Sequence, residues 1–99
     1  MLRGMATYDE IQIGDSATFT KTISESDVYL FAGITGDLNP AHIDAVSAAN
    51  GMFRQRVAHG MLTGSFISTV VGMQLPGPGS IYAAPELSFR APVFFGDTV

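Results

Sequence analysis

The sequence predicts an α+β domain in which a curved sheet wraps around one long, buried helix. The run from Val57 to Pro85 contains no Asp, Glu, Lys or Arg. Its first half predicts a helix from about 60 to 74, along which small residues recur every fourth position: Gly60, Gly64, Ser68 and Gly72. Small side chains at this spacing let another backbone come close. A helix that is apolar on most faces is buried on most faces, and a wrapped sheet is its simplest cover in a short chain.

The segment before this helix predicts a strand and then a short helix. Residues 16–23, "SATFTKTI", alternate loosely and predict the strand. Ser24 stands three residues before Asp27, a spacing typical of a capping box, so a helix is expected at about 25–35. Gly36 is well placed to end that helix.

The last quarter of the chain predicts further strands. "LPGPG" at 75–79 ends the long helix, and residues 80–99 are rich in strand formers, with Pro85 and Pro92 indicating bulges or an edge. A sheet that covers a helix needs more strands than these segments supply. We therefore interpret residues 1–99 as a single domain that is truncated at its C-terminus, or that takes its remaining strands from elsewhere.

Composition narrows the class of protein. Hydrophobic residues make up 46% of the 99 residues and charged residues 14%, which favours one packed domain with apolar surface buried by a partner chain. A net charge of -4 without a basic cluster disfavours nucleic-acid binding. The absence of cysteine excludes disulfides and thiolate metal sites. No signal peptide or membrane-length apolar segment is evident, so we expect a cytoplasmic protein.

The stretch "GDLNPAH" at 36–42 carries a carboxylate and an imidazole five positions apart, Asp37 and His42. A regular helix would place them about 140° apart. Pro40 fixes its own φ and restricts Asn39, so an irregular loop can turn both side chains towards one point. Taken alone, the stretch fits either an acid–base pair or a polar turn with a surface histidine.

Several longer stretches of the sequence add to what the "GDLNPAH" stretch indicates. The segments "FAGITGDLNPAHID", "VAHGMLTGSFIS", "LPGPGSIY" and "LSFRAPVFFGDTV" resemble the MaoC-like dehydratase family, which includes the (R)-specific enoyl-CoA hydratases. The resemblance runs from about Tyr8 to Val99. It implies the hot-dog fold, an antiparallel sheet curled around a long central helix, usually paired as a homodimer. Domains of the family continue for several strands beyond the position of "GDTV".

The resemblance implies reversible addition of water to trans-2-enoyl thioesters of CoA or a carrier protein, with no other cofactor. Asp37 and His42 match the catalytic pair of the family; we expect Asp37 to be the main base and His42 to move the proton towards C2. Gly60 matches the oxyanion donor. It lies at the expected start of the central helix, where free N–H groups and the helix dipole favour a developing enolate.

Other residues have supporting roles in this interpretation. Asn39 and Pro40 shape the loop. Ser68 matches a serine that hydrogen-bonds the catalytic aspartate, although it also fits as a small helix residue. His59 either contacts substrate or holds the start of the helix, with the structural role favoured. Arg54 and Arg56 either meet CoA phosphates or lie in a solvated loop. Two histidines and scattered carboxylates do not predict a metal site.

Two other functions fit the same fold. A hot-dog thioesterase would not require the D-x-N-P-x-H loop together with A-H-G-M. A non-catalytic module that binds acyl thioesters or serves in assembly would not require Asp37, His42 and Gly60 together. The sequence therefore favours a hydro-lyase over both alternatives.

Overall fold

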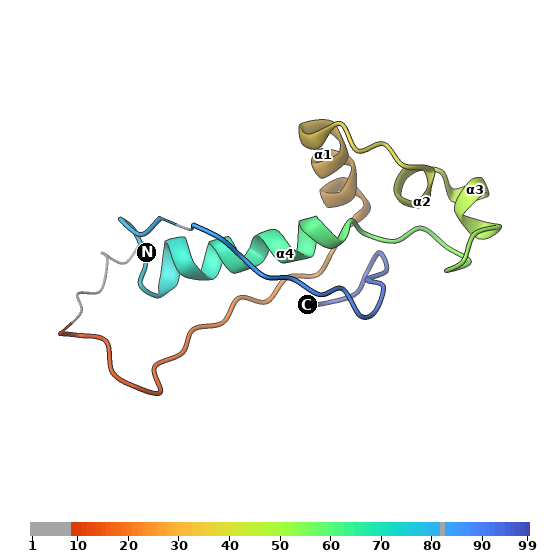
Figure 1. The fold of residues 1–99 in the computed structure, drawn as a ribbon. Helices are drawn as coiled ribbons and strands as arrows, with labels where there is room; N and C mark the ends of the chain where they lie inside the picture. The colour runs from red at the N-terminus through yellow and green to blue at the C-terminus, as the bar shows by residue number, and fades with distance from the viewer. Residues whose placement is uncertain (1–8, 82) are drawn as a thin grey trace. The chain divides into compact units, whose positions relative to one another are not determined.

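The structure is a computed structural model that describes residues 9–81 and 83–99 (Figure 1). Residues 1–8 and Tyr82, which fall within the predicted domain, lie outside the described part. The described helices are α1 (Glu25–Thr35), α2 (Pro40–Ile43), α3 (Ala45–Ala49), α4 (Gly60–Thr69) and a π-helical turn, η1 (Val70–Gln74). None of them has the length and apolar character needed to cross a bilayer.

The chain divides into two compact units, which are described separately. Unit 1 contains the described residues of 1–19 and 64–87, and unit 2 contains residues 20–63 and 88–99. The most deeply buried apolar side chains of the described residues all belong to unit 2: Ile23, Val28, Ala32, Ala48, Val57, Ala58 and Leu62. Unit 2 therefore has its own small core, and α1 supplies its centre.

The predicted helix at 25–35 is confirmed as α1, because its local end signals are strong. Ser24 accepts a hydrogen bond from the Asp27 backbone N–H, and the Asp27 carboxylate accepts one from the Ser24 backbone N–H, which completes the capping box. Gly36 ends the helix with φ 78°, a left-handed conformation that glycine adopts without strain.

Removing this cap is expected to destabilise the protein measurably. Ser24→Ala should lower the free energy of unfolding by about 1 kcal/mol, because one N-terminal N–H of α1 loses its acceptor. Urea unfolding followed by circular dichroism would measure this loss. Ser47→Ala, at an exposed position within α3, is the matched control and should change little. Equal stabilities of Ser24→Ala and wild type would contradict the role of the cap.

The same cap should make stability depend on pH. The Lys21 ammonium hydrogen-bonds the Asp27 carboxylate at 2.8 Å and, with contributions from Ser24, lowers the pKa of Asp27 from 3.8 to about 2. A depressed pKa means that the stabilisation is present above pH 3.8 and is lost as the pH falls towards 2. The stability difference between wild type and Asp27→Asn should therefore shrink across that window.

Two short helices follow α1, after an irregular link from Gly36 to Asn39. Asn39 caps α2 by accepting the Ala41 N–H at 2.9 Å, and Pro40 occupies the first turn, where its missing N–H costs nothing. Asp44 caps α3 by accepting the Ser47 N–H at 3.0 Å. The helical start at Pro40 replaces part of the irregular loop that the sequence predicts at 36–42.

The predicted long helix at 60–74 is confirmed in position, but its burial is lower than expected. It consists of α4 and η1 and ends at Leu75. Met61, Ile67 and Met73 are 55%, 40% and 45% exposed. Within the described residues the wrapped sheet that would cover these side chains is not formed, so their apolar surface stays accessible.

In the described residues, neither of the two regions predicted to form strands contains a regular β-strand. Extended segments pair at two isolated antiparallel bridges, Thr22 with Thr98 and Val57 with Phe94. Both bridges lie in unit 2, and the first is extended by hydrogen bonds between Lys21 and Val99. Further backbone bonds join Ile23 with Asp97 and Gly96, and Ala58 with Val93, but in the described residues these pairings do not extend into the continuous ladder that a strand requires.

Unit 1 contains the later turns of α4, together with η1 and the turn that follows. The Phe66 ring meets the Phe19 ring edge-on, with centroids 5.6 Å apart. The Ser80 hydroxyl donates towards the carbonyls of Val71 and Gly77, which fastens the turn to the helix. Phe19 and Phe66 thus tie the N-terminal segment to α4 within this unit.

Candidate active site

Unit 2 brings together three of the predicted site residues that are far apart in the sequence. Asp37 lies in the link between α1 and α2, His42 lies in α2, and His59 directly precedes α4. One side-chain oxygen or nitrogen from each of the three lies within 4.8 Å of the other two. The carboxylate and the two imidazoles therefore form one cluster, which we call the Asp–His–His cluster.

The Asp37 loop is held by short-range hydrogen bonds. The Thr35 hydroxyl accepts the Asp37 backbone N–H at 3.2 Å, and Asp37 Oδ1 accepts the Asn39 N–H at 3.3 Å. This local turn orients the carboxylate, while the residue as a whole remains exposed. The carboxylate is therefore both positioned and accessible to a small molecule.

His42 is anchored through one ring nitrogen. Its Nδ1 lies 2.7 Å from the carbonyl oxygen of Val57, and the Val57 N–H donates to the Ala41 carbonyl at 3.0 Å. A carbonyl can only accept, so Nδ1 carries the proton. In the neutral ring Nε2 is then the nitrogen with a free lone pair, suited to accept a proton from water.

His59 is the buried member of the cluster, with 4% of its surface exposed. Its Nε2 lies 3.0 Å from the backbone carbonyl oxygen of Asp37. Its ring stacks on that of His42, with centroids 3.8 Å apart and planes inclined by 27°. The Phe31 ring packs against it edge-on at 4.9 Å. His59 thus contacts both members of the predicted catalytic pair.

Gly60 is the first residue of α4 and is close-packed. A Cβ atom at this position would lie 3.0 Å from the ring of Phe89, closer than side chains normally approach. Across residues 9–81 and 83–99, the Gly60 N–H makes no hydrogen bond to backbone or side chain. Gly60 can therefore both pack closely against Phe89 and offer its N–H to an oxyanion. By contrast, a Cβ at Gly72 would meet open space.

The remaining predicted residues lie outside the cluster. Ser68 falls in unit 1, so its predicted bond to Asp37 stays a prediction. Arg54 is exposed in the loop after α3, with φ 64°. Arg56 is held within unit 2: it pairs with Glu25, donates to the Tyr29 hydroxyl at 2.6 Å and lies 4.7 Å from the Phe95 ring centroid.

These contacts affect both the charge and the availability of Arg56. The hydrogen bond to Glu25 raises the pKa of Arg56 above its ordinary value. The guanidinium is therefore permanently charged and is already engaged with Glu25 and Tyr29. Of the two arginines, Arg54 is the more available for a phosphate group.

The donor atoms of the Asp–His–His cluster are close enough to bind a metal ion, although the ring geometry does not favour it. A histidine lone pair lies in the plane of its ring, and the rings of His42 and His59 are stacked and nearly parallel. Lone pairs that lie in two stacked ring planes, with centroids 3.8 Å apart, are poorly placed to converge on one ion, as tetrahedral coordination would require. The arrangement suits proton transfer better than metal binding.

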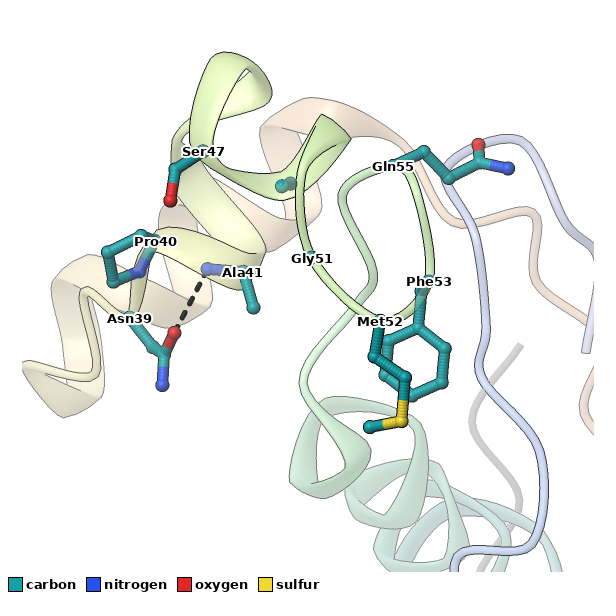
Figure 2. Close-up of a pocket in the computed structure, with 9 residues that line it drawn as sticks. Asn39, Pro40, Ala41, Ser47, Gly51, Met52, Phe53 and Gln55 are labelled. Atoms are coloured by element: carbon teal, nitrogen blue, oxygen red, sulfur yellow. Dashed lines mark hydrogen bonds between the residues drawn. The ribbon is translucent and has the colours of Figure 1, made fainter.

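A separate hollow of about 330 Å³ lies beside α2 and α3 (Figure 2). It is lined by Asn39, Pro40, Ala41, Ser47, Ala48, Gly51, Met52, Phe53 and Gln55. None of the three cluster side chains lines it. The bond between Asn39 and the Ala41 N–H, which starts α2, crosses one side of this hollow. The hollow and the cluster thus have no residue in common, although Asn39 and Pro40, which line the hollow, lie between Asp37 and His42 in the sequence.

Two contributors to the cluster were not found by sequence reasoning. The Thr35 hydroxyl supports the Asp37 backbone, and the Val57 carbonyl fixes the ring of His42. A threonine two residues before the aspartate is a local signal that could have been used. The Val57 carbonyl carries no signal in the sequence, because every residue has one.

Comparison with known families and proteins agrees with the resemblance that the D-x-N-P-x-H and A-H-G-M motifs indicate. The family described as "MaoC like domain" matches residues 10–99. The chain is 54% identical over 92 residues to the (R)-specific enoyl-CoA hydratase of Rhodospirillum rubrum, covering 93% of the chain and 64% of that protein. It is 47% identical to the 3-hydroxybutyryl-CoA dehydratase of Methylorubrum extorquens, covering 93% of the chain and 59% of that protein. The chain thus spans about three fifths of these relatives.

Solved structures show the same relationship. The unliganded R-hydratase PhaJ1 from Pseudomonas aeruginosa matches with a TM-score of 0.89 and 46% identity, over 95% of this chain and 61% of that one. The (R)-hydratase from A. caviae involved in PHA biosynthesis matches with a TM-score of 0.85 and 42% identity, over 89% of this chain and 67% of that one. The structure therefore matches those of R-hydratases, and the chain belongs to the MaoC-like domain family.

Proposed function

We propose that this chain carries the active site of an (R)-specific enoyl-CoA hydratase, which adds water reversibly to trans-2-enoyl thioesters. The observation that carries the proposal is the Asp–His–His cluster, in which an accessible carboxylate and an imidazole with a free Nε2 lie together. The 54% identity to an (R)-specific enoyl-CoA hydratase supports the choice of substrate class.

In the proposed reaction, one water molecule is held by Asp37 and by Nε2 of His42. Asp37 takes one proton as the water attacks C3 of the enoyl group, and Nε2 of His42 accepts that same proton and moves it to C2, so the water ends as the 3-hydroxyl group and the new C2 hydrogen while both side chains return to their starting states. The described contacts support these roles, since His42 Nδ1 is occupied by Val57 and leaves Nε2 as the working nitrogen. The reverse reaction, dehydration of a 3-hydroxyacyl thioester, uses the same groups in the opposite order.

The thioester oxygen gains negative charge as the enolate forms, and we assign the Gly60 N–H to that oxygen. Gly60 lies at the N-terminus of α4, where the helix dipole favours an anion. The absence of a side chain is required twice, for the packing of Phe89 and for the approach of the thioester. A preorganised N–H of this kind stabilises the transition state more than the ground state.

The complete sheet, the role of Ser68, the homodimer and the contact with CoA are also proposals. We infer that the extended segments complete a hot-dog sheet around α4, and that Ser68 then supports Asp37. Exposed apolar residues on α1, Leu30 at 65% and Ile34 at 82%, support burial by a second copy in a homodimer. Arg54 is the better placed of the two arginines to meet a CoA phosphate.

Hydration of crotonyl-CoA tests this function directly. We expect loss of the enoyl-thioester absorbance and formation of the (R)-3-hydroxy product, identified by chiral chromatography of the released acid. The same assay with an enoyl carrier protein compares the two thioester classes. Release of free thiol without hydration would instead indicate a thioesterase. Binding of the thioester without turnover would indicate a non-catalytic module.

A further inference from the structure

No step of the proposed reaction uses His59, yet its side chain contacts both members of the proposed catalytic pair. It is 4% exposed, its Nε2 reaches the Asp37 carbonyl oxygen at 3.0 Å, and its ring covers one face of His42 at 3.8 Å. The edge of Phe31, from α1, closes another side at 4.9 Å. Four segments of unit 2 therefore meet at this one imidazole.

The contacts of His59 restrain both members of the catalytic pair at once. The bond to the carbonyl of Asp37 fixes the backbone that carries the carboxylate. The stacked ring limits rotation of His42, whose Nδ1 is already held by Val57. A ring that is held at one nitrogen and covered on one face has little freedom except to present Nε2 in a single direction.

The chemistry of His59 itself argues against a direct part in proton transfer. The nitrogen that faces the Asp37 carbonyl carries the proton, because a carbonyl can only accept. The other nitrogen, Nδ1, is fully buried and makes no hydrogen bond to any described group. Neither ring nitrogen is therefore placed to exchange a proton with a water molecule or a substrate.

We propose that His59 is a positioning residue, which aligns Asp37 through its backbone and His42 through ring stacking. This role rests on the proposed hydratase function and extends it to a residue outside the water-binding pair. A bare Nδ1 that is buried without a hydrogen bond costs stability. A residue needed only for packing could be apolar and avoid this cost, whereas the donor at Nε2 requires an imidazole or its equivalent.

Two amide substitutions separate this role from simple packing. In His59→Gln the amide nitrogen stands as many bonds from Cβ as Nε2 does and can still donate to the Asp37 carbonyl. In His59→Asn the amide is one methylene shorter and cannot reach it. We expect kcat for crotonyl-CoA to fall about 10- to 100-fold in His59→Asn and only a few-fold in His59→Gln, with KM nearly unchanged in both.

Equal losses in the glutamine and asparagine variants would overturn the proposal, as would full activity of His59→Asn. A lower melting temperature with unchanged kcat would assign His59 to packing alone. If His59 instead acted as an acid or base, neither amide would restore activity. Wild-type turnover of crotonyl-CoA is measured alongside, so that failure of the hydratase assignment is recognised separately.

A readout that does not depend on turnover completes the test. Long-range ¹H–¹⁵N spectra of the imidazole rings report which nitrogen carries the proton. We expect the proton on Nε2 of His59 and on Nδ1 of His42 in the wild type. In His59→Asn the signals of His42 should shift and broaden, whereas in His59→Gln they should broaden less. Unchanged His42 signals in both variants would overturn the positioning role.

Discussion

Replacing Asp37 by asparagine is expected to lower kcat for enoyl-CoA hydration about 10²- to 10⁴-fold, the usual contribution of a positioned acid–base group. Asparagine has the same shape, and its Oδ1 can still accept the Asn39 N–H that now bonds to Asp37 at 3.3 Å. The turn should therefore persist. The second carboxylate oxygen, however, becomes an NH₂ group, which cannot accept a proton from water.

Steady-state kinetics with crotonyl-CoA measure the effect, and KM should change little, because Asp37 is assigned to the water and not to the thioester. Asp44→Asn is the matched control. Asp44 is a carboxylate seven residues away whose role is to cap α3 through the Ser47 N–H. Asparagine is also a good N-cap, so this control should keep both stability and activity. Near wild-type turnover in Asp37→Asn would refute the assignment of Asp37 as the base.

Replacing His42 by asparagine is expected to have a comparable effect, about 10²- to 10⁴-fold in kcat, with little loss of stability. The amide nitrogen of asparagine lies where Nδ1 lies in histidine, so it can still donate to the Val57 carbonyl. The anchor of α2 is then retained while Nε2 is removed. The variant thus isolates the chemical role of the ring from its structural role.

His42→Gln is the complementary variant. Its amide lies at the position of Nε2, so the bond to Val57 is lost, and the carbonyl is left without its partner. We expect this variant to lose activity and also to melt at a lower temperature than His42→Asn. Thermal unfolding and kinetics on the same samples give both quantities. Full activity of His42→Asn would show that Nε2 takes no part in the reaction.

The sequence predicted best those features that depend on neighbouring residues. The capping box of Ser24 and Asp27 and the terminal Gly36 act within a few residues, and the helix they bound was placed correctly. The spacing of Asp37 and His42 around an Asn–Pro turn likewise indicated that the two side chains could approach one point, and the structure brings them into one cluster. What was not anticipated is that His42 lies on a helical turn, which begins at Pro40 and is capped by Asn39.

The features that depend on distant partners could not be predicted in the same way. The stacking of His59 on His42 joins residues 17 positions apart, and the bond from His42 to Val57 uses a backbone group. The burial of α4 was overestimated because an apolar pattern shows which faces need cover but not what covers them. The expected strands have the right composition, but in the described residues they pair only at two bridges.

Val57 and Ala58 link His42 to the C-terminal segment of the chain. The carbonyl of Val57 holds His42, Val57 forms a bridge with Phe94, and the Ala58 N–H donates to the Val93 carbonyl at 2.8 Å. Val93 and Phe94 therefore support, through Val57, the backbone that orients the His42 ring. Under the proposed function, loss of this pairing should abolish hydratase activity before the helices unfold, so activity and helix content should be lost in separate transitions on heating.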